Sequence, residues 1–275
     1  MIDLHLHTTA SDGQLSPEAL VAAAARVGCV AMAVTDHDTV AGIPAARDAA
    51  TRAGLTFVAG IEMTAVAEDV DVHILGYGID ITDSTLDHFL RVQRERRLDR
   101  VAAIGDRLAQ LGAPVDVTSL LATPATSGRS VGRPAVAALL VAAGHAADLA
   151  DAFDRYLAEG RPAFLPRIGP EPAEVVVRLR ASGGLSSIAH PGKLQRDHLI
   201  APMIEAGLGA IEVYHPDHAV ADVVRYQTMA DRHGLLVTGG SDFHGAGSAR
   251  DAALGHVGLP PTAFTRLVAH LGDGR

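Results

Sequence analysis

Histidines and carboxylates stand at the ends of the predicted strands of this 275-residue chain. We predict seven short strands, and nearly every one ends in residues of these types. The strand segments are Met1–His7, Val30–His37, Thr56–Glu62, Val70–His73, Leu185–His190, Ile211–His215 and Leu236–His244. In a barrel of parallel strands these ends share one rim, so residues far apart in sequence converge there. Histidines and carboxylates without cysteine form a ligand set typical of divalent metals in catalytic sites.

The alternation of strand and helix signals predicts an α/β fold. Ser16 and Gly28 delimit a helix that starts at Pro17, and glycine also ends the Ala-rich helix at Gly42–Gly54. This rhythm implies parallel strands joined by right-handed crossovers. A hydrophobic content of 48% suffices for a sizeable core.

The alternation breaks between Gly78 and Leu185. A long, charge-rich helix at Ser84–Leu111, with Ser84 as its N-cap, leads into a loop-like segment and two further helices. A crossover in a simple barrel needs far less chain. Insertions of this kind lie over the catalytic rim and shape substrate access. The predicted domains are a barrel at 1–113 and 167–275 and a helical insertion at 114–166.

Composition narrows the setting of the protein. The lone cysteine, Cys29, excludes an internal disulfide and fits a reducing compartment, and we expect it to be buried and inert. The chain enters a strand directly, so we expect no cleaved signal peptide, and no apolar stretch is long enough to cross a bilayer. A net charge of −9 argues against a broad nucleic-acid-binding face. We therefore expect a cytoplasmic protein without DNA or membrane partners.

The spacing of the rim residues supports a metal centre. Residues two apart on a strand face the same side, so His5 points with His7 and Asp242 with His244. Seven of the fourteen histidines lie at strand ends, and the other seven are expected to be ordinary surface residues. A single rim histidine would suit a hydrogen-bonded core residue, whereas seven on one rim favour metal binding.

These motifs resemble the PHP (polymerase and histidinol phosphatase) family. The matching segments are His-Leu-His-Thr, Ser-Asp-Gly, Thr-Asp-His-Asp-Thr, Gly-Ile-Glu-Met-Thr, His-Ile-Leu-Gly-Tyr-Gly, Ala-His-Pro-Gly and Gly-Ser-Asp-Phe-His-Gly. Two further elements, at Gly132–Pro134 and Glu212–Pro216, are similar to the stand-alone bacterial branch that hydrolyses nucleoside 3′,5′-bisphosphates and trims short RNA from its 5′ end. The resemblance implies a distorted (β/α)7 barrel, which agrees with the seven strands predicted above. Together with the small helical insertion this is the expected fold.

The resemblance also implies two or three divalent ions, of Mn, Fe or Zn. His5, His7, Glu62 and Asp242 match one site; Glu62, His73 and His190 match a second that shares Glu62; Asp12, His37 and His244 match a third. Related members often carry histidine where Asp12 stands, so we expect a shift in metal preference. Such ions generate hydroxide at neutral pH and stabilise a leaving oxyanion. Asp242 and His215 are the expected catalytic residues.

Substrate-binding residues are sought among basic side chains near the rim. Arg133, Arg161 and Arg167 lie in or beside the insertion, and arginine binds phosphate through two parallel hydrogen bonds. A solvated surface arginine is the alternative for each. Lys193 and His215 are also expected on the rim, where His215 contacts a phosphate or donates a proton.

The expected activity is that of a metal-dependent phosphatase acting on nucleotides. We expect it to convert nucleoside 3′,5′-bisphosphates to 5′-monophosphates, with short 5′-phosphorylated RNA as a second substrate. Histidinol-phosphate phosphatase and a non-catalytic metal-binding domain are the alternatives. An amidohydrolase is disfavoured, because such sites usually use a lysine and Lys193 is the only one in the chain.

Overall fold

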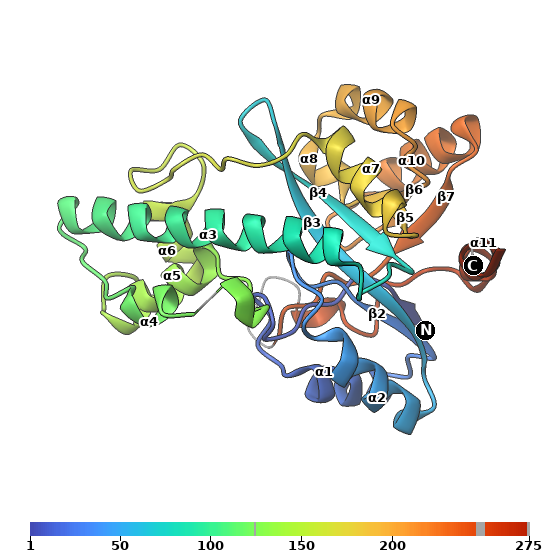
Figure 1. The fold of residues 1–275 in the computed structure, drawn as a ribbon, viewed down its shortest axis with the longest axis horizontal. Helices are drawn as coiled ribbons and strands as arrows, with labels where there is room; N and C mark the ends of the chain where they lie inside the picture. The colour runs from blue at the N-terminus through green and yellow to red at the C-terminus, as the bar shows by residue number, and fades with distance from the viewer. Residues whose placement is uncertain (124, 246–250, 274–275) are drawn as a thin grey trace.

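A seven-stranded sheet forms the centre of the protein (Figure 1). The computed structural model describes residues 1–123, 125–245 and 251–273. The strands follow one another in chain order across the sheet. They are β1 (Ile2–Asp3), β2 (Ala31–Val34), β3 (Thr56–Ala67), β4 (Val70–Tyr77), β5 (Leu185–Ile188), β6 (Ala210–Tyr214) and β7 (Leu236–Gly239).

The first and last strands meet beyond their regular hydrogen-bonded segments. Leu6 pairs with Phe243 in a parallel bridge. The Asp242 amide donates to the His5 carbonyl at 2.9 Å, and the His7 amide donates to the Phe243 carbonyl at 3.1 Å. The sheet is therefore nearly closed into a barrel, which confirms the predicted fold class.

The prediction of uniformly parallel strands was wrong for β4. This strand runs antiparallel to both β3 and β5, whereas the other neighbouring pairs are parallel. Glu68 and Asp69 form a two-residue turn between β3 and β4, both with positive φ, which leaves no room for a crossover helix. His73 consequently lies in the middle of β4 rather than at its end. The reversed direction still places His73 at the rim, opposite Thr64 of β3.

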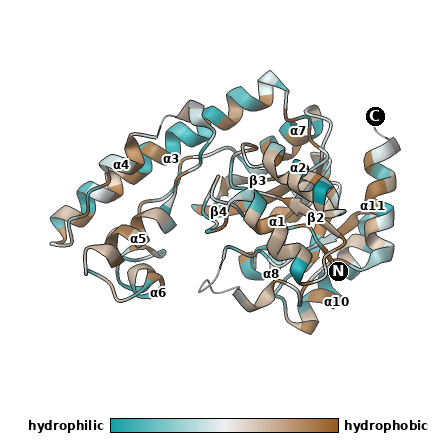
Figure 2. Cartoon of the chain, turned by 90° about the horizontal axis from the view of Figure 1, so that it is seen from below, coloured by the Kyte–Doolittle hydropathy of each residue, from teal (hydrophilic) through white to brown (hydrophobic). Residues whose placement is uncertain are grey.

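Helices cover the sheet and extend beyond it (Figures 1 and 2). Those around the sheet are α1 (Pro17–Arg26), α2 (Ile43–Ala53), α7 (Pro172–Ala181), α8 (Pro191–Leu194), α9 (Ile200–Glu205), α10 (Val220–His233) and α11 (Pro261–Asp273). Those that extend to one side are α3 (Ser84–Gln110), α4 (Thr118–Leu121), α5 (Arg133–Ala142) and α6 (Leu149–Ala152), with a π-helical turn at Phe153–Leu157. Short 3₁₀ turns lie at Ala125–Ser127, Asp197–Leu199 and Asp251–Ala253.

The long helix α3 joins two hydrophobic cores. Leu86 and Leu90 in its first half pack with the barrel strands and α7. Val101, Ile104 and Leu108 in its second half pack in a separate core with α5 and the segment up to residue 163. The side chains of 114–166 thus bury themselves mainly against α3 and one another. The exact bounds of an insertion domain stay a prediction.

Local details confirm two expectations and correct a third. The Ser16 hydroxyl caps α1 by accepting from the Ala19 amide. Cys29 is buried, and burial raises the pKa of its thiol to about 11. Asp83, rather than Ser84, caps α3, because its carboxylate accepts from the Thr85 amide. None of the helices in the described part of the chain combines the length and apolar character needed to cross a bilayer.

Candidate metal centre

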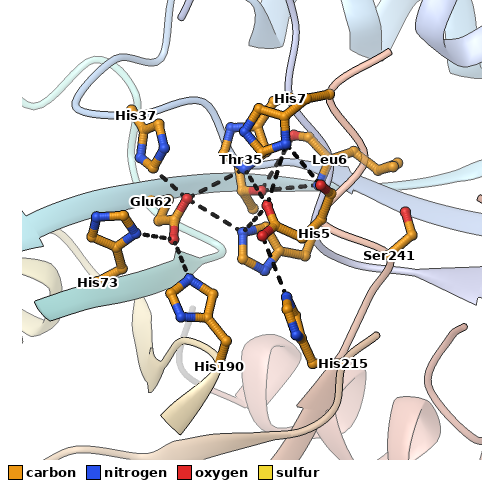
Figure 3. A network of polar contacts seen from close by, with 12 residues as sticks. His5, Leu6, His7, Thr35, His37, Glu62, His73, His190, His215 and Ser241 are labelled. Carbon is orange, nitrogen blue, oxygen red and sulfur yellow. Dashed lines mark hydrogen bonds and ion pairs between the residues drawn. The ribbon is translucent and has the colours of Figure 1, made fainter. Parts of the chain in front are cut away.

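All nine predicted metal ligands lie together at one end of the barrel. Figure 3 labels six of them, His5, His7, His37, Glu62, His73 and His190. They come from the segments after β1, β2, β5 and β7 and from β3 and β4. Groups that could hold an ion include His5, His7, Glu62 and Asp242; His37, Glu62 and His73; and His7, Asp12, His37 and His244.

The first group is fully buried and has the spacing of a metal shell. The Nε2 atoms of His5 and His7 each lie 3.3 Å from Glu62 Oε2. The same atoms lie 3.3 and 3.1 Å from Asp242 Oδ1. A tetrahedral ion with ligand bonds of about 2.0–2.1 Å sets its ligand atoms roughly 3.4 Å apart. These four histidine–carboxylate distances are therefore already close to those around a bound ion.

Glu62 links this group to a second one. Its Oε1 atom lies 2.8 Å from His73 Nδ1 and 3.2 Å from His190 Nε2. The two oxygens of Glu62 thus face different sets of histidines, as the predicted bridging role requires. His37 Nδ1 also lies 3.1 Å from Glu62 Oε2, so His37 is close to this group as well as to the third.

The third group is looser and gathers around Asp12. Asp12 Oδ1 lies 3.4 Å from His244 Nε2, and Asp12 Oδ2 lies 3.6 Å from His37 Nε2. His7 Nδ1 approaches Asp12 Oδ1 to 3.7 Å. His7 therefore has one ring nitrogen toward each of two groups, which the sequence did not suggest.

Ligand-type atoms in this cluster lack hydrogen-bond partners among the described residues. They are His5 Nε2, His7 Nδ1 and Nε2, His37 Nδ1, His73 Nδ1 and Glu62 Oε2, and all are buried. Buried polar atoms are ordinarily satisfied, so a convergent set of unsatisfied nitrogens and an oxygen fits bound cations. The residues present therefore suit divalent metals.

The electrostatics of the cluster also favour positive charge. Burial alone would lower the pKa of His7, but the adjacent carboxylates of Asp242 and Glu62 outweigh it and raise the pKa to about 10. Burial would raise the pKa of Glu62, but the adjacent histidines, His37 first, hold it well below its usual range. The carboxylates thus stay ionised and attract cations.

Backbone geometry fixes several of these side chains. Leu6 packs into the core with Phe243, so His5 and His7 turn to the opposite face. The Thr35 hydroxyl accepts from the Leu6 amide at 3.1 Å, which ties this segment to the end of β2. Asp242 and His190 both have positive φ, 50° and 29°, a conformation that is costly for residues with a side chain.

The predicted substrate residues lie in three different settings. Arg133 and Arg167 meet at Asp71, each 3.3 Å from one of its oxygens. Arg161 and Lys193 are exposed, and neither lines the pocket that contains Arg133 and Arg167. His215 is buried, with its Nε2 atom 3.3 Å from Asp242 Oδ2.

Sequence reasoning missed other residues beside the site. The pocket next to α3 is lined by five arginines, Arg96, Arg97, Arg100, Arg133 and Arg167. Arg97 is buried and donates to Asp38 Oδ2 at 2.7 Å. Arg97 and Arg100 are three residues apart and so share a helix face, which was the one available signal. Glu212, in a segment noted only for its resemblance, contacts two of the predicted ligands.

Comparisons with known proteins agree with this arrangement. The profile of the PHP domain matches residues 3–158. The 5′-3′ exoribonuclease Rnm of Escherichia coli (strain K12) is 37% identical over 251 residues, which cover 88% of this chain and 84% of that protein. The 3′,5′-nucleoside bisphosphate phosphatase of Chromobacterium violaceum is 34% identical over 267 residues, which cover 94% of this chain and 93% of that protein.

A solved structure shares the whole architecture. It comes from Bifidobacterium adolescentis and is described as a predicted metal-dependent phosphoesterase. It is 34% identical in sequence, with a TM-score of 0.89 over 98% of this chain and 96% of that one. The barrel, the clustered ligands and these similarities together show that the chain belongs to the PHP family of metal-dependent phosphoesterases.

Proposed function

We propose that this phosphoesterase hydrolyses nucleotides that carry two phosphates on one ribose, with nucleoside 3′,5′-bisphosphates as the preferred substrates. The observation that supports this specificity is the arginine-lined pocket beside the metal centre. Similarity to the bisphosphate phosphatase of Chromobacterium violaceum agrees with it.

The nine clustered side chains are the proposed metal ligands. We assign His5, His7, Glu62 and Asp242 to one ion, Glu62, His73 and His190 to a second, and Asp12, His37 and His244 to a third. A nitrogen and oxygen ligand set without sulfur suits Mn, Fe or Zn. Divalent ions there supply Lewis acidity and lower the pKa of bound water. The protein's own part is to hold the ligands at fixed spacing and to admit the phosphoryl group.

The arginine pocket supplies a second anion site. Asp38 and Asp71 are the carboxylates within ion-pair distance of its five arginines among the described residues. Burial, followed by the positive charge of Arg97, lowers the pKa of Arg167 to about 9. Burial, followed by the positive charge of Arg133, lowers the pKa of Arg100 to about 10. A bound phosphate would relieve this excess of positive charge and is therefore the anion that we propose.

The arginine pocket and the metal centre are linked by neighbouring residues of the same segments. Asp71 and His73 lie two residues apart on β4 and so face the same side. Asp38, which pairs with Arg97, directly follows His37. The cavity among these arginines is small, about 10 Å³, so the side chains that line it must move apart to admit a phosphate. We propose that they do so, and that a 5′-phosphate binds these arginines while the 3′-phosphoryl group reacts at the metal centre.

The same placement accommodates short RNA. In a 5′-phosphorylated oligoribonucleotide the 3′-phosphoryl group is a diester to the next nucleotide. Attack of water on this phosphorus with cleavage of its bond to the 3′ oxygen would release a 5′-mononucleotide and leave a 5′-phosphate on the shortened RNA. Similarity to the exoribonuclease of Escherichia coli supports this second substrate. Release of mononucleotides from a short 5′-phosphorylated RNA, compared with the same RNA lacking that phosphate, tests it.

The predicted catalytic pair takes different roles in this proposal. Asp242 is a metal ligand. The Asp217 amide donates to His215 Nδ1 at 3.1 Å, so neutral His215 carries its proton on Nε2, toward Asp242 Oδ2. Because its side chain is fully buried, we propose that His215 orients Asp242. Donation of a proton from His215 to the leaving group stays a prediction.

A pair of substrates tests the two-site arrangement directly. Adenosine 3′,5′-bisphosphate and adenosine 3′-monophosphate offer the same ester, but only the first has a 5′-phosphate. A charged hydrogen bond contributes about 1.5–3 kcal/mol, so we expect kcat/KM to favour the bisphosphate about 10- to 100-fold. Equal kcat/KM values would contradict the proposed specificity.

Arg133→Ala should remove this preference. The side chain is partly exposed, so its loss is tolerable for folding, and its guanidinium borders the pocket. We expect KM for the bisphosphate to rise about 10- to 100-fold while kcat stays similar, because the contact is remote from the reacting phosphate. Turnover of adenosine 3′-monophosphate and p-nitrophenyl phosphate should barely change.

Arg161→Ala is the matched control, since Arg161 is exposed and outside the pocket. Its kinetics should match the wild type on every substrate. If Arg133→Ala slowed the monophosphate and the bisphosphate equally, Arg133 would act at the reacting phosphate. If the substitution changed neither substrate's kinetics, Arg133 would be a solvated surface arginine without a role in substrate binding.

A further inference from the structure

Glu212 is a fully buried carboxylate in the middle of β6. It belongs to neither the proposed metal ligands nor the arginine pocket. Its Oε1 atom lies 2.9 Å from His5 Nδ1, and its Oε2 atom accepts from the His190 amide at 2.7 Å. Each oxygen therefore contacts a residue of a different proposed metal site.

The contact with His5 selects one form of its ring. An ionised carboxylate can only accept, so His5 Nδ1 must carry the proton. The lone pair of neutral His5 is then on Nε2, which faces Glu62 and Asp242 at 3.3 Å each. Ligating histidines are ordinarily held in this way by a carboxylate or carbonyl on the other nitrogen.

The contact with His190 holds an unfavourable backbone conformation. His190 has φ 29° and ψ 56°, although the residue before a proline is ordinarily extended. Such conformations persist only where surrounding contacts hold them. The hydrogen bond to Glu212 is one such contact, and in this conformation His190 Nε2 lies 3.2 Å from Glu62 Oε1.

We propose that Glu212 is a positioning residue that couples the two sites sharing Glu62. One oxygen sets the ring form of His5, and the other holds the backbone of His190. The inference rests on the proposed metal centre and assigns a residue that binds neither metal nor substrate.

Glu212→Gln separates this role from simple packing. The His190 amide can only donate, so the glutamine oxygen should turn to it. The glutamine NH₂ group then faces His5 Nδ1 and donates to it, which moves the His5 proton to Nε2. The variant keeps its hydrogen bonds and its fold, but His5 holds a proton at the nitrogen that should bind metal.

The experiment titrates metal-free protein with Mn²⁺ and follows free Mn²⁺ by electron paramagnetic resonance. We expect Glu212→Gln to bind about 10- to 100-fold more weakly than the wild type, the usual effect of losing a carboxylate behind a ligating histidine. Glu205→Gln removes the same charge at an exposed position of α9, and this variant should bind Mn²⁺ like the wild type. Circular dichroism of the metal-free proteins checks that both variants are folded.

A second measurement needs no variant. In the zinc-loaded wild-type protein, ¹⁵N NMR of the histidine rings should show His5 protonated at Nδ1. A proton on Nε2 would overturn the inference even if Glu212→Gln failed to fold.

The outcomes separate the two proposals. If the wild type takes up no Mn²⁺, the proposed metal centre fails and the role of Glu212 fails with it. If the wild type binds Mn²⁺ and folded Glu212→Gln binds equally well, the metal centre stands and the role of Glu212 is wrong.

Discussion

Replacement of Glu62 by glutamine should nearly abolish phosphatase turnover. Its two oxygens lie within 3.3 Å of five histidine rings, those of His5, His7, His37, His73 and His190. An amide has one weakly accepting oxygen and no charge, so it cannot bridge two cations. Loss of a partner behind a ligand costs about 10- to 100-fold, and loss of a bridging ligand should exceed that range in kcat.

Metal content should fall in parallel, which elemental analysis of the purified variant would measure. Glu68→Gln is a suitable control, because Glu68 lies at the tip of the same hairpin and is exposed. It should retain wild-type kcat and metal content. A Glu62→Gln variant with normal kcat would show that the bridging assignment is wrong.

Removal of the metals should eliminate activity in the wild-type protein. The proposed reaction uses no side-chain nucleophile, and the side chains in the cluster are proposed to act as metal ligands. Without bound metal, no group in the cluster is proposed to carry out the hydrolysis. After chelation and desalting we expect turnover of adenosine 3′,5′-bisphosphate to be lost, and to return on addition of Mn²⁺ or Zn²⁺.

Removal of the metals should also lower the stability of the folded protein. A ligand present at 100 times its dissociation constant stabilises the folded state by about 2.7 kcal/mol. For a chain of this size that corresponds to a fall in Tm on the order of 5 °C after chelation. Scanning calorimetry with and without metal would measure the shift. Full activity of demonstrably metal-free protein would contradict the mechanism.

The sequence indicated the barrel and the metal centre because both follow from the succession of strands and helices along the chain and from the residues at the strand ends. A ligand at the end of a strand stays there whatever the neighbouring elements do, so His5, His37 and His190 could be placed from strand ends alone. The direction of β4 could not be placed in that way. It depends on a two-residue turn at Glu68 and Asp69, which are not the residues most typical of such turns.

Contacts between segments that are far apart in the sequence could not be predicted from strand ends and local patterns. Arg97 looks like one of many charged residues on a long helix, and only the docking of α3 against Asp38 buries it. Glu212 and His190 are 22 residues apart and meet because β5 and β6 pair in register. Glu212 was noted only as part of a segment that resembles a known family, and nothing in the sequence showed which groups it would contact.

The reversed strand β4 has a consequence for how this enzyme would recognise its substrate. Asp71 anchors the arginine pocket and His73 faces the metal centre, and both belong to a segment of β4 that pairs with β3. On the other side of this segment, the His73 carbonyl accepts from the Ala189 amide at 3.0 Å. Two strand residues span roughly 7 Å, and a strand held in a ladder of hydrogen bonds is already extended and cannot stretch further. In the proposed enzyme β4 would therefore fix the distance between the two phosphate sites. It would select substrates by the distance between their two phosphates.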